Sequence, residues 1–278
     1  MGSLLRMELL KLVKRPMTWI LLILLLGGIG FGDVVGFLQI NRVSANVRAS
    51  ILDNLTLPGT LTQTSQFIYF FGSIMLAILA ASAIGSEYSW GTLRPMLATG
   101  VPRLRFLAAK LVALAIVAVA FDVLPLIMNA ILAVPVGLLA NVPVFTGTFD
   151  AGWVGDLLAL AGRTYLMILV AILIAFLVSL LGRSQAIGVG AALGLLIGEL
   201  IVSQALMALG LTWATTLVNI FPNRNSQSLL AYNVFGPVDR TGGVLGQAHS
   251  LITLAVYCLL CVVIALAVFR RRDISGAA

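Results

Sequence analysis

Charged residues are scarce in this sequence. Asp, Glu, Lys and Arg together make up 10% of its 278 residues, whereas 60% are hydrophobic. Soluble domains have about 25% charged residues, so this composition lacks the polar groups for a water-facing surface. The sequence therefore predicts an integral membrane protein without a large soluble domain. The net charge of +7 does not indicate nucleic-acid binding, because the basic residues flank apolar segments, as topology signals do.

The sequence also lacks the motifs of common enzyme chemistry. Without a GxxxxGK[ST] loop the chain cannot by itself hold ATP in the P-loop manner. HExxH and GxSxG are missing, and the single histidine, His249, cannot build a multi-histidine metal site. Cys258 and Cys261 have CxxC spacing but no further ligands, which favours core packing over metal or redox chemistry. We predict no catalytic residue, no metal and no cofactor on this chain.

Long apolar runs are what the sequence has instead. About 20 apolar helical residues cross a hydrocarbon core of about 30 Å. We predict one all-α transmembrane domain over residues 1–278, with crossings at 17–38, 66–86, 104–138, 164–182, 185–211 and 250–269. The third run has the length for two crossings, but the polar break at Asp122 and Pro125 is too short for a turn. One helix kinked at Pro125 is preferred.

The basic residues predict the orientation. With both termini in the cytoplasm, twelve of the 17 Lys and Arg residues lie on the inner side, as the positive-inside rule requires. The inner residues are Arg6, Lys11, Lys14, Arg15, Arg94, Arg103, Arg105, Lys110, Arg183, Arg270, Arg271 and Arg272, and the outer residues are Arg42, Arg48, Arg163, Arg224 and Arg240.

Two segments outside the crossings have their own patterns. Residues 3–15 place apolar and basic side chains on opposite faces of a helix; the apolar residues are Leu5, Leu9, Leu12 and Val13, and the basic ones Arg6, Lys11, Lys14 and Arg15. This pattern predicts an amphipathic helix in the cytoplasmic interface, or else a charged flank of the first crossing. Residues 212–249 are too apolar for a free outer loop, so we expect short interfacial helices or a re-entrant hairpin.

Glycines recur at four-residue spacing in the first and fifth crossings. The two stripes are Gly28, Gly32, Gly36 and Gly190, Gly194, Gly198. Such stripes let membrane helices approach closely, and we expect the two helices to pack on each other or across a subunit boundary. The alternative is that glycine is simply frequent in membrane helices.

Three acids fall within or near the predicted crossings. Asp33 is expected near the outer interface, where water solvates it. Asp122 and Glu199, with Asn129, Ser203 and Gln204, form either a polar path or structural hydrogen bonds between helices. Both interpretations stay open, and a secondary transporter that couples protons through Glu199 or Asp122 is one function they permit.

The segment between the second and third crossings carries a family resemblance. It reads ASAIGSEYSWGTLRPMLATGVPRLRFLAAKL, and with the entry helix and six crossings it resembles the ABC-2 family of ABC-transporter permeases. In particular it looks like the small bacterial exporters of the antibiotic-resistance and self-immunity type. The matching positions are Glu87, Gly91, Thr92, Leu93, Arg94, Arg103 and Arg105. The resemblance covers essentially the whole chain, but only this stretch is specific.

The resemblance implies a type V exporter-like architecture in the bacterial cytoplasmic membrane. Residues 87–103 would be a coupling segment that contacts two separate ATPase subunits, which hold ATP and Mg²⁺; its contact residues would be Glu87, Tyr88, Trp90, Gly91, Thr92, Leu93, Arg94 and Arg103. A second permease, identical or homologous, would complete the complex among membrane lipids, without nucleic acid. Substrate-path residues would be Phe67, Phe70, Phe71, Met75, Asp122, Asn129, Glu199 and Gln204.

An aromatic, weakly charged path suits an amphipathic or lipid-like substrate, such as a drug, a peptide antibiotic or a lipid. We therefore expect an exporter subunit without its own ATPase site. A proton-coupled secondary transporter and a membrane-embedded assembly or sensor protein are the alternatives.

Overall fold

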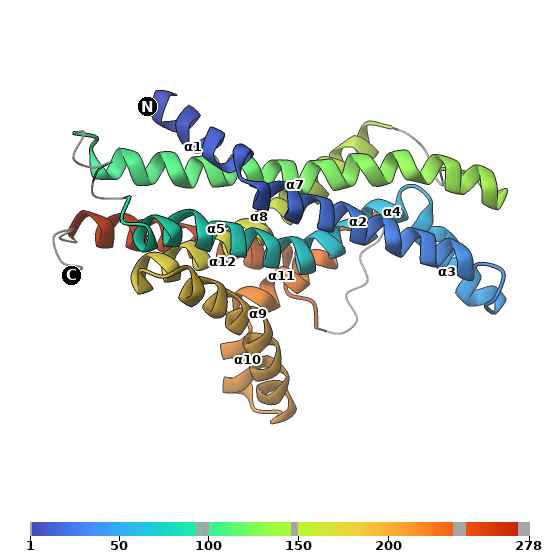
Figure 1. The fold of residues 1–278 in the computed structure, drawn as a ribbon. Coiled ribbons are helices and arrows are strands. Elements are labelled where there is room, and N and C mark those ends of the chain that lie inside the picture. The colour runs from blue at the N-terminus through green and yellow to red at the C-terminus, as the bar shows by residue number, and fades with distance from the viewer. Residues whose placement is uncertain (1, 93–94, 96–99, 146–149, 236–242, 272–278) are drawn as a thin grey trace.

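The computed structural model describes residues 2–92, 95, 100–145, 150–235 and 243–271 as helices joined by turns (Figure 1). In chain order the elements are α1 (Gly2–Lys14), α2 (Pro16–Gln39), α3 (Ala45–Leu55), α4 (Gly59–Phe67), the π-helix η1 (Ile68–Gly72), α5 (Ser73–Ser89), α7 (Arg103–Ala140), α8 (Ala151–Gly182), α9 (Gln185–Ala208), α10 (Thr212–Val218), α11 (Pro222–Leu230) and α12 (Gln247–Arg271).

Among these described residues, six helices are long and apolar enough to cross a membrane. They are Pro16–Gln39, Gly59–Ser89, Arg103–Ala140, Ala151–Gly182, Gln185–Ala208 and Gln247–Arg271, and each overlaps one of the predicted crossings. The second combines α4, η1 and α5, and α7 continues through Pro125 as a single helix. An all-helical, multi-pass membrane protein is thus confirmed.

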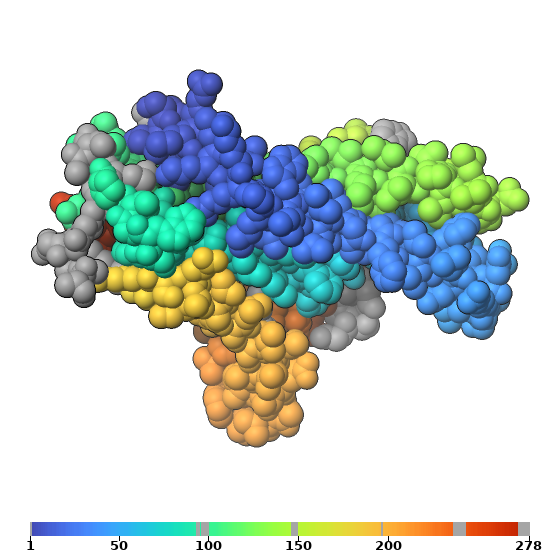
Figure 2. All heavy atoms as spheres, in the orientation of Figure 1, coloured from blue at the N-terminus to red at the C-terminus, as the bar shows by residue number. Residues whose placement is uncertain are grey.

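The centre of the bundle is formed by α5 and α8, which pack along each other. Leu79 and Ile84 of α5 and Phe176 and Leu180 of α8 are fully buried. The helices α2, α9 and α12 lie at the periphery and keep most of their apolar surface exposed. Figure 2 shows the end of α9 and α10, in orange, projecting from the side of the bundle. Lipid tails satisfy such surfaces, because they are as apolar as the side chains themselves.

Small residues bring the start of α9 against α5 and α8. A Cβ atom on Gly85 would lie 2.5 Å from the Gln185 nitrogen, and one on Gly188 would lie 2.5 Å from Ser179 Cβ. Both approaches are too close for any side chain larger than hydrogen. In lipid, such backbone proximity is a main source of helix association.

One end of the bundle gathers several chain ends. Figure 1 places the start of α1, the end of α5, the start of α7 and the end of α12 together there, whereas α3 and the end of α7 lie at the opposite end. We call the first of these the terminal end. Helices that run back and forth an even number of times bring the two ends of a chain to the same side.

The segment after α9 forms two short helices, α10 and α11. Short helices were one of the predicted alternatives, but the polarity of α11 was not anticipated. Its Asn223, Asn225 and Ser226 are buried, and α11 packs on α8, α9 and α12. The Asn225 amide donates to the carbonyls of Asn219 and Phe221. A side chain of α11 thus satisfies backbone acceptors in the turn that connects it to α10.

Candidate functional site

A buried cluster of four charges joins three elements at the terminal end. Lys110 Nζ donates to Glu8 Oε2 at 2.6 Å and to Glu87 Oε1 at 2.8 Å. Lys11 Nζ lies 2.8 Å from Glu8 Oε1 and 3.5 Å from Glu87 Oε1. Two acids and two bases therefore balance each other, which is the condition for placing charge in an apolar interior. We call these four residues the charge cluster.

Each element contributes to the charge cluster through local geometry. Glu8 and Lys11 are three residues apart in α1, so they share one helix face. Glu87 lies in the last turn of α5, and Lys110 lies in the second turn of α7, where its Nζ also donates to the Ala83 carbonyl at 3.2 Å. The cluster ties the entry helix to both sides of the segment 87–103.

The electrostatics keep Glu8 ionised. Burial raises the pKa of the Glu8 carboxyl, but the charge of Lys110 and hydrogen bonds from Lys11 and Lys110 outweigh burial, so the pKa lies below its ordinary value of 4.5. Glu8 is only 2% exposed. Glu8 therefore takes part in the cluster as a carboxylate rather than as a neutral acid.

A second link joins the start of α2 to α5. The Arg15 guanidinium donates to the Ser82 carbonyl and hydroxyl, both at 3.4 Å, and to the Ser86 hydroxyl at 3.2 Å. Arg15 immediately precedes Pro16, which begins α2. The turn between α1 and α2 is thus held against the same stretch of α5 that carries Glu87.

The entry helix α1 contacts the core with part of its predicted apolar face. Leu12 is buried and Leu5 and Leu9 pack on the core, as the amphipathic pattern predicts. Val13, however, is 45% exposed, and Glu8 is buried instead. Val13 therefore does not pack on the core, because the charge cluster turns the face with Glu8 inward. Glu8 was missed altogether; its spacing of three residues from Lys11 was the available signal.

The predicted coupling residues surround the end of α5. Tyr88 packs against the core, whereas Trp90 is 73% exposed. Gly91 has φ +66°, a left-handed conformation that favours glycine, and it ends α5. Arg103 is exposed at the start of α7, and Thr92 is half-buried. Leu93 and Arg94 lie outside the described residues.

A cleft of about 560 Å³ opens beside the charge cluster. Its lining residues come from the α1–α2 turn and from the segment after α5: Lys11, Lys14, Arg15, Pro16, Glu87, Trp90, Thr92 and Pro95. Basic groups thus dominate one wall, and an exposed indole forms the other. We call this the Trp90 cleft.

The predicted aromatic path residues lie on and beside η1. The rings of Phe67 and Phe71 are 4.5 Å apart, and Phe67 packs beside Gly28 of α2. Phe70 and Phe71 are half exposed on the bundle surface, and Met75 is partly buried against the core. The aromatic stretch therefore lies partly between helices and partly on the exposed surface of the bundle.

The polar residues predicted for the path separate into two places. Asn129 of α7 donates to the Thr64 hydroxyl at 2.6 Å and neighbours Asp33 of α2. The expectation that water solvates Asp33 was wrong, because Asp33 is 7% exposed and faces α7. Asp122 lies about two helical turns before Asn129 on α7. It is 2% exposed, and its Oδ1 has no hydrogen-bond partner among the described residues.

Glu199 of α9 occupies the other place. Its Oε1 accepts hydrogen bonds from the backbone nitrogens of Asn223 at 2.6 Å and Arg224 at 3.2 Å, so it caps the start of α11. Glu199 lines two cavities. Asp122, Asn129 and Gln204 line neither of them. Gln204 is exposed on α9 and Ser203 is buried.

The two glycine stripes have different surroundings. A Cβ on Gly28 would approach the Phe67 ring, and one on Gly36 would contact Leu55 of α3, whereas Gly32, Gly190, Gly194 and Gly198 have open space. Within the described chain, α2 packs on α3 and α7 and α9 packs on α5, α8 and α10. Packing across a subunit boundary stays a prediction for both stripes.

Comparison with protein families gives one match over most of the chain. The model of DUF2705, described as a protein of unknown function, matches residues 21–275. This range contains every long apolar helix except the first few residues of α2 and begins after the entry helix. No curated protein matches the sequence.

Proposed function

We propose that this chain, which belongs to the DUF2705 family, is the membrane-spanning permease subunit of an ATP-driven exporter. Separate ATPase subunits drive it, and its helices form the path for an amphipathic or lipid-like substrate. The observation that carries the proposal is the charge cluster, which connects the entry helix with both sides of the segment that resembles an ABC-2 coupling segment.

The location of the Trp90 cleft supports a docking role. An exposed tryptophan beside basic residues offers an apolar anchor and charge complementarity to a soluble acidic or mixed surface. A force applied there reaches α5 directly through Glu87 and reaches α1 and α7 through Glu8 and Lys110. Because α5 packs along α8 at the centre of the bundle, moving its end moves the core.

The proposed complex has four subunits, two ATPases and two permeases. Two copies of an ATPase bind ATP and Mg²⁺ and close on each other. Two permeases, identical or homologous, receive that motion at their Trp90 clefts. The terminal end then faces the cytoplasm of a bacterial cell, where the basic residues of α1, α7 and α12 also satisfy the positive-inside rule.

The test uses two exposed tryptophans. Trp90→Ala removes the anchor at the Trp90 cleft, and Trp213→Ala removes one on α10; they are 73% and 57% exposed. We expect Trp90→Ala to abolish copurification with the ATPase encoded beside the gene and to abolish transport, while Trp213→Ala retains both. Full ATPase association in the Trp90 variant would overturn the docking role, and no association with the unaltered chain would overturn the proposed function.

A proton-coupled transporter is the second candidate, and the buried carboxyl of Asp122 favours it. Its Oδ1 lacks a partner among the described residues, as in proton-carrying sites. Asp122→Asn and Glu199→Gln in proteoliposomes separate the candidates. Transport that needs a proton gradient and no ATPase, and that fails in either variant, would favour this second function.

A further inference from the structure

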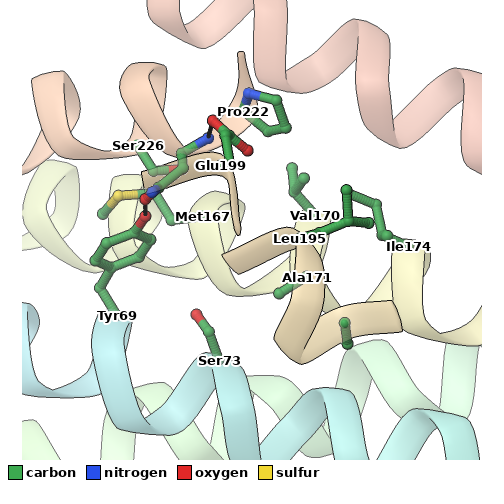
Figure 3. A pocket seen from close by; sticks show the side chains of 12 residues that line it. Tyr69, Ser73, Met167, Val170, Ala171, Ile174, Leu195, Glu199, Pro222 and Ser226 are labelled. Atoms are coloured by element: carbon green, nitrogen blue, oxygen red, sulfur yellow. Dashed lines mark hydrogen bonds between the residues drawn. The ribbon is translucent and has the colours of Figure 1, made fainter. Parts of the chain in front are cut away.

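Two cavities of different size meet at Glu199. One is a small cavity of about 40 Å³ between η1, α5, α8, α9 and α11, shown in Figure 3. The other is an apolar groove of about 680 Å³ between α9, α11 and α12. They share the lining residues Ile174, Leu195, Glu199 and Pro222. We propose that together they bind a primary ammonium group carried on an apolar body, with the ammonium in the small cavity and the apolar body in the groove.

The small cavity has an unused polar group. Ser73 is fully buried, and its hydroxyl has no hydrogen-bond partner among the described residues. Figure 3 shows Ser73 and Tyr69 facing the same space as Glu199 from the opposite side. The Tyr69 hydroxyl donates its hydrogen to Asn223 Oδ1 and has the Ser226 side chain as a further hydrogen-bond partner. A buried hydroxyl without a partner in a cavity of this size indicates a polar occupant, and its oxygen can accept a hydrogen bond from one that carries N–H groups.

The charge of the site selects a cation. Both hydrogen bonds to Glu199 end on Oε1 and come from backbone nitrogens, and among the described residues no Lys or Arg side chain forms an ion pair with it. The Arg224 guanidinium instead donates to the Gly243 carbonyl. A carboxylate at membrane depth needs a counter-charge, and the capped start of α11 supplies only part of one. Oε2 is left to pair with a ligand cation.

The size of the small cavity selects a primary ammonium. About 40 Å³ holds a group the size of a few water molecules, whereas a trimethylammonium head is larger. An ammonium has three N–H donors, and the acceptors available to it are Glu199 Oε2 and Ser73 Oγ. A divalent metal is a poor fit, because a single carboxylate lines the cavity and hard divalent cations require several charged oxygens.

The groove accommodates the rest of the ligand. Its walls are Val202 on α9 and Tyr257, Leu260 and Ile264 on α12, and its volume suits a drug-sized apolar body. Gly194 and Gly198 line it without side chains, and a Cβ on either would meet nothing within 4 Å. The second glycine stripe thus keeps space open beside Glu199. As a cargo site this assignment rests on the proposed transport function, but ligand binding does not.

The experiment measures binding to the purified chain in nanodiscs without any ATPase, so its outcome is independent of the exporter proposal. The probes are radiolabelled dodecylammonium, dodecyltrimethylammonium and dodecanol, with empty nanodiscs as background. We expect dodecylammonium to bind about tenfold more tightly than either other probe, because only it supplies both the positive charge and N–H donors.

Three variants locate the binding. Glu199→Gln keeps an oxygen to cap α11 but should weaken dodecylammonium about tenfold and leave dodecanol unchanged. Ser73→Ala should weaken dodecylammonium about fivefold and leave dodecyltrimethylammonium unchanged. Gly194→Leu should fill the groove and weaken all three probes. Ile201→Ala, on the exposed face of α9 outside both cavities, is the matched control and should bind like the unaltered chain.

The proposal fails if the unaltered chain shows no preference for dodecylammonium over dodecanol, or if Glu199→Gln retains that preference with unchanged thermal unfolding. Equal binding of the trimethylammonium probe would overturn the assignment of a primary ammonium. Proton uptake lost in Glu199→Gln without any probe binding would assign the carboxyl to proton coupling instead.

Discussion

The ammonium nitrogen of Lys110 lies 2.6 Å from Glu8 Oε2, although 102 residues separate them in the chain. This contact joins the helix that precedes the first membrane-length helix to the start of the third. Together with Glu87 and Lys11, these two residues form the charge cluster, in which each member is ion-paired with another. Its integrity is open to measurement in the isolated chain.

Removing the central cation should destabilise the protein. Lys110→Met leaves Glu8 and Glu87 buried with only Lys11 nearby, and breaking a buried ion pair in this way costs about 3–5 kcal/mol. Thermal unfolding in detergent measures the loss. Lys14→Met, at an exposed position of the same entry helix, should change little. Combining Lys110→Met with Glu8→Gln should recover part of the stability, and a double variant as unstable as the sum of the single variants would argue against direct coupling.

The charge cluster should make stability depend on pH. The pKa of Glu8 is lower in the folded chain than its ordinary value of 4.5, so its ionised form stabilises the fold fully above that value. This contribution is lost as the pH falls through the lower, folded pKa. Unfolding of the unaltered chain and of Glu8→Gln, compared from pH 7 down to about pH 3, should show a stability difference that is constant at first and shrinks below about pH 4.5. A constant difference throughout would mean that Glu8 is not ionised in the fold.

The turn after α5 depends on a left-handed glycine. Gly91→Ala forces an L side chain to φ +66°, which costs about 1 kcal/mol. Gly190→Ala provides a matched control, because Gly190 is helical and a Cβ there meets nothing within 4 Å. We expect a lower unfolding temperature for the first variant and an equal or higher one for the second. Identical shifts in both would show that the turn is not strained by a side chain.

Two glycines of the same helix should respond oppositely to a larger residue. Gly188→Leu drives a side chain into Ser179 of α8 and should destabilise the fold by about 1–3 kcal/mol. Gly194→Leu meets open space and should leave the unfolding temperature of the chain unchanged. If the second stripe also packs across a subunit boundary, Gly194→Leu will weaken dimer crosslinking without destabilising the single chain. Equal destabilisation by both variants would contradict the packing described here.

The long helices could be predicted from the sequence because each apolar run must be covered either by lipid or by protein, and both environments favour a helix. The contacts of single residues could not. A charged face on an entry helix is ordinarily solvated, and only the approach of Lys110 from a distant helix makes burial of Glu8 favourable. Asp33 was misassigned for the same reason, since its neighbour Asn129 belongs to another helix. The glycine spacing predicted close packing along α9, but the close approach to other helices occurs at Gly188, outside the predicted stripe.

The length of α7 gives the bilayer a way to act on the charge cluster. Its 38 residues measure about 57 Å, and the stretch after Lys110 remains apolar, apart from Asp122 and Asn129, for longer than a hydrocarbon core of about 30 Å. Such hydrophobic mismatch is relieved by tilting or by local thickening of the bilayer. A thinner membrane would tilt α7 further and swing Lys110, together with Glu8 and Glu87, relative to the rest of the bundle. The acyl-chain length of the lipids would then affect the positions of the same residues that join the entry helix to α5.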